Sequence, residues 1–144
     1  MYIPQHFTLE EFFPEQFFRD YFPRYGQLLW SLFPTEVLWT QDRLRERYGP
    51  CLINDWVAKG HNRYRGYRPF DCPVGATLSM HKFALAVDSE FPDTPVGKIR
   101  QDILEDPWHE TFKYIRCIES GVSWLHWDFR NHDKKNLGIK VIHR

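Results

Sequence analysis

The sequence has no excess of charge of either sign, because 19 basic residues balance 19 acidic ones. Proteins whose main work is gripping nucleic acid carry a basic excess, so this balance argues against a nucleic-acid partner. No uninterrupted apolar stretch approaches the ~20 residues of a membrane-spanning helix, which argues against stable membrane insertion. The first residues, Met1 to Phe7, lack the charged and apolar regions of a secretory signal. We therefore expect a soluble protein made in a cytoplasm.

Cysteine is scarce, and its number is odd: Cys51, Cys72 and Cys117. Their spacing does not form a disulfide framework, so we expect reduced thiols in a reducing compartment. An alternative is that Cys72 or Cys117 binds a metal or acts as a nucleophile. Isolated cysteines are more often small buried hydrophobic residues, and we favour that interpretation.

Aromatic residues are abundant, at 17% of the 144 residues. A chain of this length suits one domain, residues 1–144, with a core that needs no disulfides. The aromatic run from Phe12 to Phe22 could form a membrane-surface face. It lacks a basic stripe beside it, so we predict that it packs in the core.

Three helices are predicted from their end signals. A capping box at Thr8 begins a short helix, which Pro14 interrupts. A second helix begins at residues 34–36 with Thr35 as its cap and ends at Gly49. A third follows residues 94–95 and stops at Pro107.

Strands dominate the second half of the chain. Residues 59–77 are rich in Gly, Pro, Arg and Tyr and predict a long, functional loop. The strands expected are residues 51–56, 85–88 (a central strand), 115–119, 122–129 and 137–142, with a turn at residues 120–121. We predict an α+β fold, in which N-terminal helices pack on a small, mainly antiparallel sheet.

One segment has the composition of a pocket floor. His81 and Asp88 can meet one ion if His81 lies at a bend and Asp88 on the strand that follows. The period of two on a strand would place Ala84, Ala86 and Asp88 on one face, where the alanines leave space beside the carboxylate. Leu85 would then point to the packed face.

A third ligand is offered by His126, which lies between two Trp residues on a predicted strand. Asp128 on the same face could orient it or line a cleft. Two His and one carboxylate leave a fourth tetrahedral position open, as in hydrolytic zinc sites. Such an ion lowers the pKa of a bound water to roughly 7, and Glu119 is the best-placed general base.

Each residue also has a simpler interpretation. His81 or His126 alone could be a core or surface histidine, and Asp88 a strand-end cap. Asp128 and Arg130 could form a surface ion pair. Glu119, before Ser-Gly, could be a turn residue.

Taken together, these residues resemble the M15 family of zinc peptidases, whose metal centre is shared with the Hedgehog N-terminal domain. The family pattern is roughly S-x-H-x-x-G-x-A-x-D, followed much later by an apolar residue and H-x-D. The residues that match it are Ser79, His81, Ala86, Asp88, Trp124, His126 and Asp128. Phage members are the most similar: they add an Asn-x-Trp strand and a Gly-x-Arg loop end, found here as Asn54–Trp56 and Gly66–Arg68. The resemblance spans roughly residues 8–130.

The resemblance implies a Hedgehog/DD-peptidase-like fold with one zinc ion per chain at His81, Asp88 and His126. It implies that Arg68 holds a substrate carbonyl or oxyanion, although a loop-anchoring ion pair is an equal alternative. Ser79 and Trp124 would contact substrate, and Asp128 would assist catalysis. The substrate would be a peptidoglycan peptide, and the bond cleaved that of a D-Ala-D-Ala carboxypeptidase or an L-alanyl-D-glutamate endopeptidase. The protein would be a phage lysin or part of a phage particle, and would reach the cell wall after release.

The chain departs from the family pattern at three positions. Ala84 stands where the family usually has Gly, which is strained if the backbone there needs positive φ and tolerable if only small size is needed. Ser123 and Trp124 occupy positions where relatives place a catalytic Glu or His, so Glu119 is the remaining candidate. The alternative function is a metal-binding phage structural or interaction protein without turnover. Manganese or cobalt could replace zinc, and oligomeric state stays open.

Overall fold

The structure is a computed structural model that describes residues 1–144. It has an α+β fold, as predicted. The α-helices are α1 (Leu9–Phe12), α2 (Glu15–Tyr25), α3 (Thr35–Tyr48), α4 (Val96–Glu105) and α5 (Lys134–Leu137). Three 3-10 helices are η1 (Gly26–Leu32), η2 (Trp56–Ala58) and η3 (Met80–Phe83). The strands are β1 (Ala86–Ser89), β2 (Cys117–Ser120), β3 (Leu125–Asp128) and β4 (Lys140–His143).

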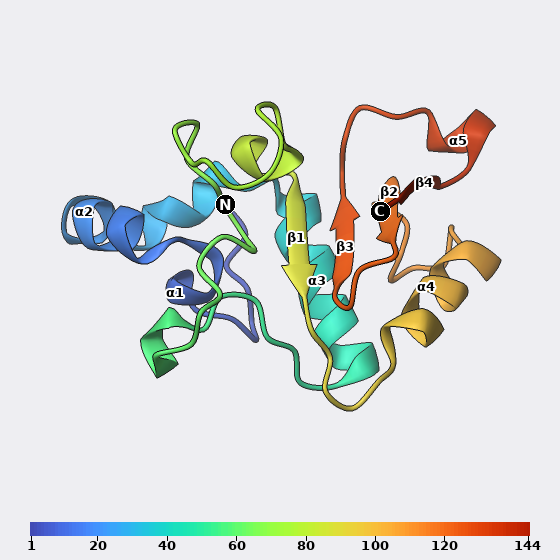
Figure 1. The fold of residues 1–144 in the computed structure, drawn as a ribbon, viewed down its shortest axis with the longest axis horizontal. Coiled ribbons are helices and arrows are strands. Elements are labelled where there is room, and N and C mark those ends of the chain that lie inside the picture. The colour runs from blue at the N-terminus through green and yellow to red at the C-terminus, as the bar shows by residue number, and fades with distance from the viewer.

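The four strands form one mixed sheet in the order β1-β3-β2-β4 (Figure 1). The β1–β3 and β2–β3 pairs are antiparallel, whereas β2 and β4 are parallel. The register places Asp88 directly opposite His126. The prediction that β1 is a central strand is wrong, because β1 is an edge strand. The loop before it covers this edge: the Asp88 amide donates to the Arg65 carbonyl oxygen at 2.8 Å.

Helix α3 packs against β1 and lies behind the sheet in Figure 1. Its side chains Val37, Leu38 and Leu44 are fully buried, as is Trp127 of β3. Gln41 makes polar contacts across this layer: its carboxamide accepts from Trp127 Nε1 at 2.9 Å. The same carboxamide contacts the Ser89 hydroxyl at 3.2 Å. This satisfied network fixes the helix against the strand that carries Asp88.

The helices begin and end close to the residues that the sequence predicted. The Thr8 amide donates to the Glu11 carboxylate at 2.8 Å, which completes the predicted capping box. Pro14 separates α1 from α2, and Gly49 ends α3 with a positive φ of 92°. The cap of α3 is Pro34, and Thr35 is already its first helical residue. A proline can hold this position because no intrahelical bond needs its missing N–H.

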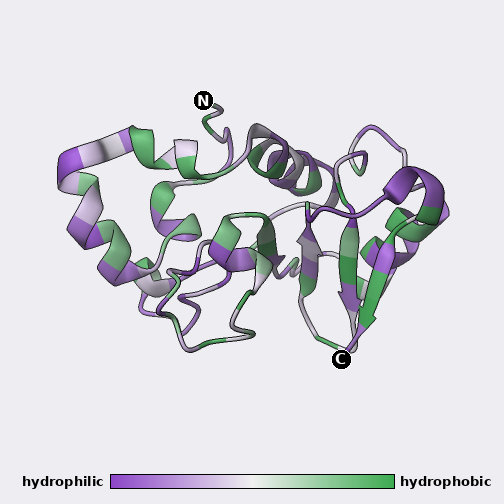
Figure 2. Cartoon of the chain, turned by 90° about the horizontal axis from the view of Figure 1, so that it is seen from above, coloured by the Kyte–Doolittle hydropathy of each residue, from purple (hydrophilic) through white to green (hydrophobic).

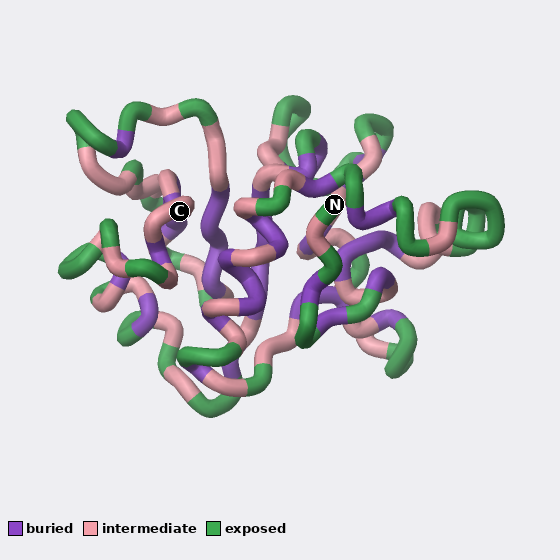
Figure 3. The backbone as a smooth tube through the Cα atoms, turned by 180° about the vertical axis from the view of Figure 1, so that it is seen from behind, coloured by how far each residue is buried: buried purple, intermediate pink, exposed green.

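The aromatic run is only partly in the core. Phe12 and Phe13 are fully buried, but Tyr21 is 44% and Phe22 37% exposed. Helix α2 lies at one end of the molecule and carries both hydrophobic and hydrophilic bands (Figure 2). The buried chain gathers in the strands and in α3 (Figure 3). The core prediction therefore holds for the first half of the run, and the second half lies on α2 away from the sheet.

One predicted strand is wrong, and one helix was not predicted. Residues 51–56 do not form a strand: only Leu52 pairs, with Glu90, and the Asn54 amide turns away to the Glu11 carbonyl oxygen. The last strand is present as β4 but begins at Lys140 instead of residue 137, because the unpredicted helix α5 ends at Leu137. Its four residues are too few for a helical period to show in the sequence.

None of the helices combines the length and the apolar composition that a membrane span requires.

Candidate metal centre

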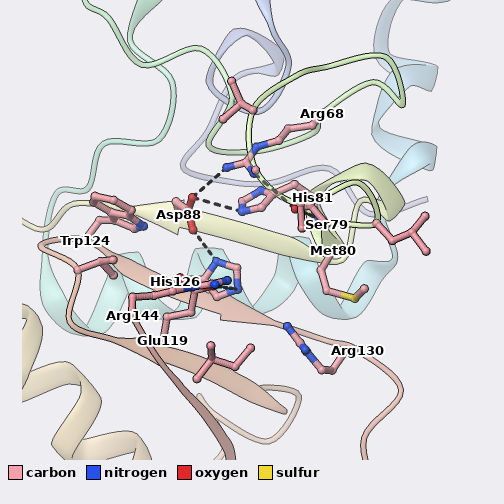
Figure 4. A pocket seen from close by; sticks show the side chains of 16 residues that line it. Arg68, Ser79, Met80, His81, Asp88, Glu119, Trp124, His126, Arg130 and Arg144 are labelled. Carbon is pink, nitrogen blue, oxygen red and sulfur yellow. Dashed lines mark hydrogen bonds and ion pairs between the residues drawn. The ribbon is translucent and has the colours of Figure 1, made fainter.

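Three buried side chains from three elements converge on one point. His81 comes from η3, Asp88 from the edge strand β1 and His126 from β3, and their exposed fractions are 2%, 5% and 5%. One ligand-type atom from each lies within 4.8 Å of the others. Figure 4 shows the Asp88 carboxylate between the two imidazole rings. This group could hold a metal ion.

The backbone around η3 aims His81. The Ser79 hydroxyl caps η3 by accepting from the His81 amide at 3.3 Å. The His81 ring then meets the Gly66 carbonyl oxygen, 2.8 Å from Nδ1. A carbonyl only accepts, so Nδ1 must be the protonated nitrogen in the neutral ring. The other ring nitrogen, Nε2, faces Asp88, 3.2 Å from Oδ2.

His126 lies between two carboxylates. Its Nδ1 is 2.7 Å from Asp88 Oδ1, and its Nε2 is 3.0 Å from Asp128 Oδ2. Burial lowers the pKa of His126, but the contacts with Asp128 and Asp88 outweigh it and raise that pKa to about 9. Burial raises the pKa of Asp88, but the two histidines outweigh it and hold that pKa well below its usual range.

Ala84 has the positive φ that the family's glycine position suggested. Its φ is 56° and its ψ 31°, and it turns the chain from η3 into β1. It therefore lies before the strand, so the prediction that Ala84, Ala86 and Asp88 share one strand face is wrong for Ala84. The left-handed conformation strains any residue with a Cβ by about 1–2 kcal/mol.

Asp128 and Arg130 do not form a surface ion pair, contrary to the simpler interpretation. Asp128 is fully buried, and Arg130 holds it with two contacts, Nε to Oδ1 at 2.7 Å and Nη2 to Oδ2 at 2.6 Å. Arg130 and His126 together keep the pKa of Asp128 low, against the effect of burial. The carboxylate is thus ionised and fixed beside His126.

Arg68 lies beside the candidate ligands, and each of its three guanidinium nitrogens donates a hydrogen bond. The exposed fraction of Arg68 is 9%. Nε donates to the Tyr64 carbonyl oxygen at 2.6 Å, Nη1 to Ser79 Oγ at 3.4 Å and Nη2 to Asp88 Oδ2 at 3.4 Å. Gly75 makes room for it, since a Cβ there would lie 2.6 Å from Nη1. Arg68 therefore links the long loop to the candidate ligand Asp88.

Glu119 reaches the other side of the site. Its Oε1 is 3.9 Å from His126 Nε2 and accepts from Arg144 Nη2 at 2.8 Å. Arg144 was missed in the sequence, because no local motif marks it. It reaches Glu119 only through the parallel pairing of β4 with β2.

These residues line one cavity of about 510 Å³. Besides the three candidate ligands, its walls include Arg68, Ser79, Glu119, Trp124, Arg130 and Arg144. Asp128 lies behind His126 and does not line the cavity. Trp124 forms part of the wall, and its indole N–H is buried without a hydrogen-bond partner.

The cysteines lie outside the ligand group. Cys72 and Cys117 are buried, as expected of small hydrophobic residues. Burial raises the pKa of Cys117 to about 12, which keeps its thiol protonated and unreactive.

Comparison with known proteins does not identify a family for this chain. No protein-family model matches the chain. No curated protein and no solved structure matches it either.

Proposed function

We propose that the chain is a zinc metallopeptidase that hydrolyses peptide bonds of bacterial peptidoglycan, as a phage lysin or a virion-associated enzyme with a Hedgehog/DD-peptidase-like fold. The observation that carries the proposal is the buried His81–Asp88–His126 group opening onto a cavity. Two imidazoles and one carboxylate are the ligand set of hydrolytic zinc, which leaves a position for water or substrate. The motif resemblance supplies the substrate class.

The donor atoms fit a divalent ion. The Gly66 carbonyl oxygen is hydrogen-bonded to Nδ1 of His81, which leaves Nε2 free to coordinate. Asp128 occupies Nε2 of His126, which leaves Nδ1 free once the ring is neutral. When bound, zinc supplies Lewis acidity and activates water at neutral pH.

The remaining roles belong to side chains of the cavity wall. Glu119 accepts the proton of the attacking water, because it is the carboxylate of the wall that is not a candidate ligand. Arg68 orients the Asp88 carboxylate through Nη2. Trp124 offers an aromatic surface to a bound peptide.

Replacement of Glu119 by Gln tests this assignment. The amide has the same shape but cannot take a proton, so peptidoglycan hydrolysis should fall by about 100-fold or more. Zinc content should stay at the wild-type level. Glu105→Gln, on the exposed end of α4, is the matched control and should leave both quantities unchanged. Full activity in Glu119→Gln would remove Glu119 from the role of base.

A second function, a metal-binding phage structural or interaction protein, is favoured by one observation. Glu119 is already paired with Arg144, and Ser123 and Trp124 offer no other base beside His126. A zinc-loaded wild type that binds peptidoglycan fragments but never cleaves them would establish this alternative.

A further inference from the structure

Three arginines line the cavity, and two of them are committed to carboxylates of the site. Arg68 is buried, with Nε, Nη1 and Nη2 bonded to groups of the chain. Arg130 grips Asp128 through Nε and Nη2, and 21% of its side chain is exposed. Turning either guanidinium toward a ligand would release Asp88 or Asp128, the two carboxylates that contact His126.

Arg144 differs from both. Its Nη2 donates to Glu119 Oε1 at 2.8 Å, while Nε and Nη1 have no partner in the chain. Its side chain is 55% exposed and lines the cavity. The guanidinium is therefore anchored at one end beside Glu119 and presents unused N–H donors to the cavity.

The backbone of Arg144 is built into this position. Its amide donates to the Ser120 carbonyl oxygen at 3.0 Å, which continues the parallel β2–β4 pairing. Gly121 admits the close approach: its φ is +80°, and a Cβ there would lie 2.3 Å from the Arg144 carbonyl oxygen. Figure 4 shows Arg144 and Glu119 together on the His126 side of the site.

We propose that Arg144 is a specificity-determining residue that binds a carboxylate group of the substrate and holds it beside Glu119. The inference rests on the proposed function for the peptide nature of that substrate. A planar guanidinium can serve two carboxylates at once, and such charge-assisted contacts are stronger than neutral ones. Without Arg144, a substrate carboxylate would face Glu119 and Asp88 with one compensating charge fewer.

The test is binding of two forms of one peptide to the zinc-loaded protein. The probes are a synthetic stem pentapeptide, L-Ala-D-Glu-L-Lys-D-Ala-D-Ala, with its carboxylates free, and the same peptide with each carboxylate as a carboxamide. Wild type should bind the acid form at least about tenfold more tightly, the size of one charge-assisted contact. R144Q should bind both forms equally, and R144K should keep part of the preference.

Arg24→Gln is the matched control, because Arg24 is exposed on α2 and forms no hydrogen bond or ion pair. It should behave as wild type. Zinc content and circular dichroism of every variant are measured first, so that a folding defect in R144Q is separated from lost recognition. An R144Q protein that keeps the wild-type preference would overturn the proposal, as would a wild type without preference.

Hydrolysis of the acid peptide, followed in parallel, separates this inference from the proposed function. An Arg144-dependent preference without any cleavage means that the peptidase proposal fails and the recognition site stands. Cleavage of both forms at equal KM means that the peptidase proposal stands and the recognition site at Arg144 fails.

Discussion

Asp128 Oδ2 lies 3.0 Å from Nε2 of His126, two residues away on the same strand. An ionised carboxylate only accepts, so this contact keeps a proton on Nε2, and Nδ1 of the neutral ring is left for a metal. A buried carboxylate that fixes the tautomer of a ligand histidine is a common feature of zinc sites. The geometry of His126 thus depends on a residue that does not itself reach the metal position.

Replacement of Asp128 by Asn should therefore weaken zinc binding by about 10- to 100-fold, because the amide holds the ring less strongly. The measurement is competition with a chromophoric chelator. Asp71→Asn, in the exposed part of the long loop and without a hydrogen bond, serves as the control. Equal zinc affinity in Asp128→Asn and wild type would show that Asp128 does not support His126.

Zinc affinity should rise with pH. In the metal-free protein the pKa of His126 is raised to about 9, so at pH 7 its ring carries a proton on both nitrogens. Zinc must displace the proton on Nδ1, and affinity therefore increases about tenfold per pH unit below pH 9 and then levels off. Titrations at pH 6, 7 and 8 check this slope, and an affinity that stays constant over this range would contradict it.

Because Ala84 has a positive φ, we predict that a smaller and a larger side chain at this position change the unfolding free energy by different amounts. In Ala84→Gly, relief of about 1 kcal/mol of left-handed strain opposes the loss of a buried methyl worth about 0.8 kcal/mol. The unfolding free energy should thus change by less than about 1 kcal/mol. Ala84→Val should destabilise by at least about 2 kcal/mol, since a β-branched residue fits neither the positive φ nor the buried space. Urea unfolding of both variants measures the difference.

Lys134 lies outside the candidate metal centre, and we predict that its replacement lowers the stability of the fold. Its ammonium donates to the carbonyl oxygens of Pro107, Phe112 and Lys113 at 2.6, 2.9 and 3.1 Å. Lys134→Met would leave the Pro107 and Lys113 carbonyls unpaired, while the Phe112 carbonyl keeps the Ile115 amide, and should destabilise the fold by about 2 kcal/mol. Lys135→Met, at the exposed neighbouring position, should change stability by less than about 0.5 kcal/mol. Equal stability of the two variants would contradict the role of Lys134.

Local signals in the sequence predicted what depends on local chemistry. The capping box at Thr8, the break at Pro14 and the stop at Gly49 all involve backbone groups within a few residues. The approach of His81, Asp88 and His126 was predicted from motif resemblance, since spacing alone admits many pairs of acids and histidines.

What the sequence did not predict depends on pairing between distant segments. The edge position of β1 and the parallel pairing of β4 depend on which strands meet, and no residue in either strand encodes that choice. For the same reason the burial of Asp128 and the contact of Arg144 with Glu119 were missed. Each arises from tertiary packing that brings distant segments together.

The decisive measurement is the metal content of purified wild type and His126→Ala, determined by mass spectrometry. Wild type should hold one zinc ion per chain, and the variant should lose it. A wild type that holds no metal, even after reconstitution with zinc, would contradict the metal centre and the peptidase proposal that depends on it.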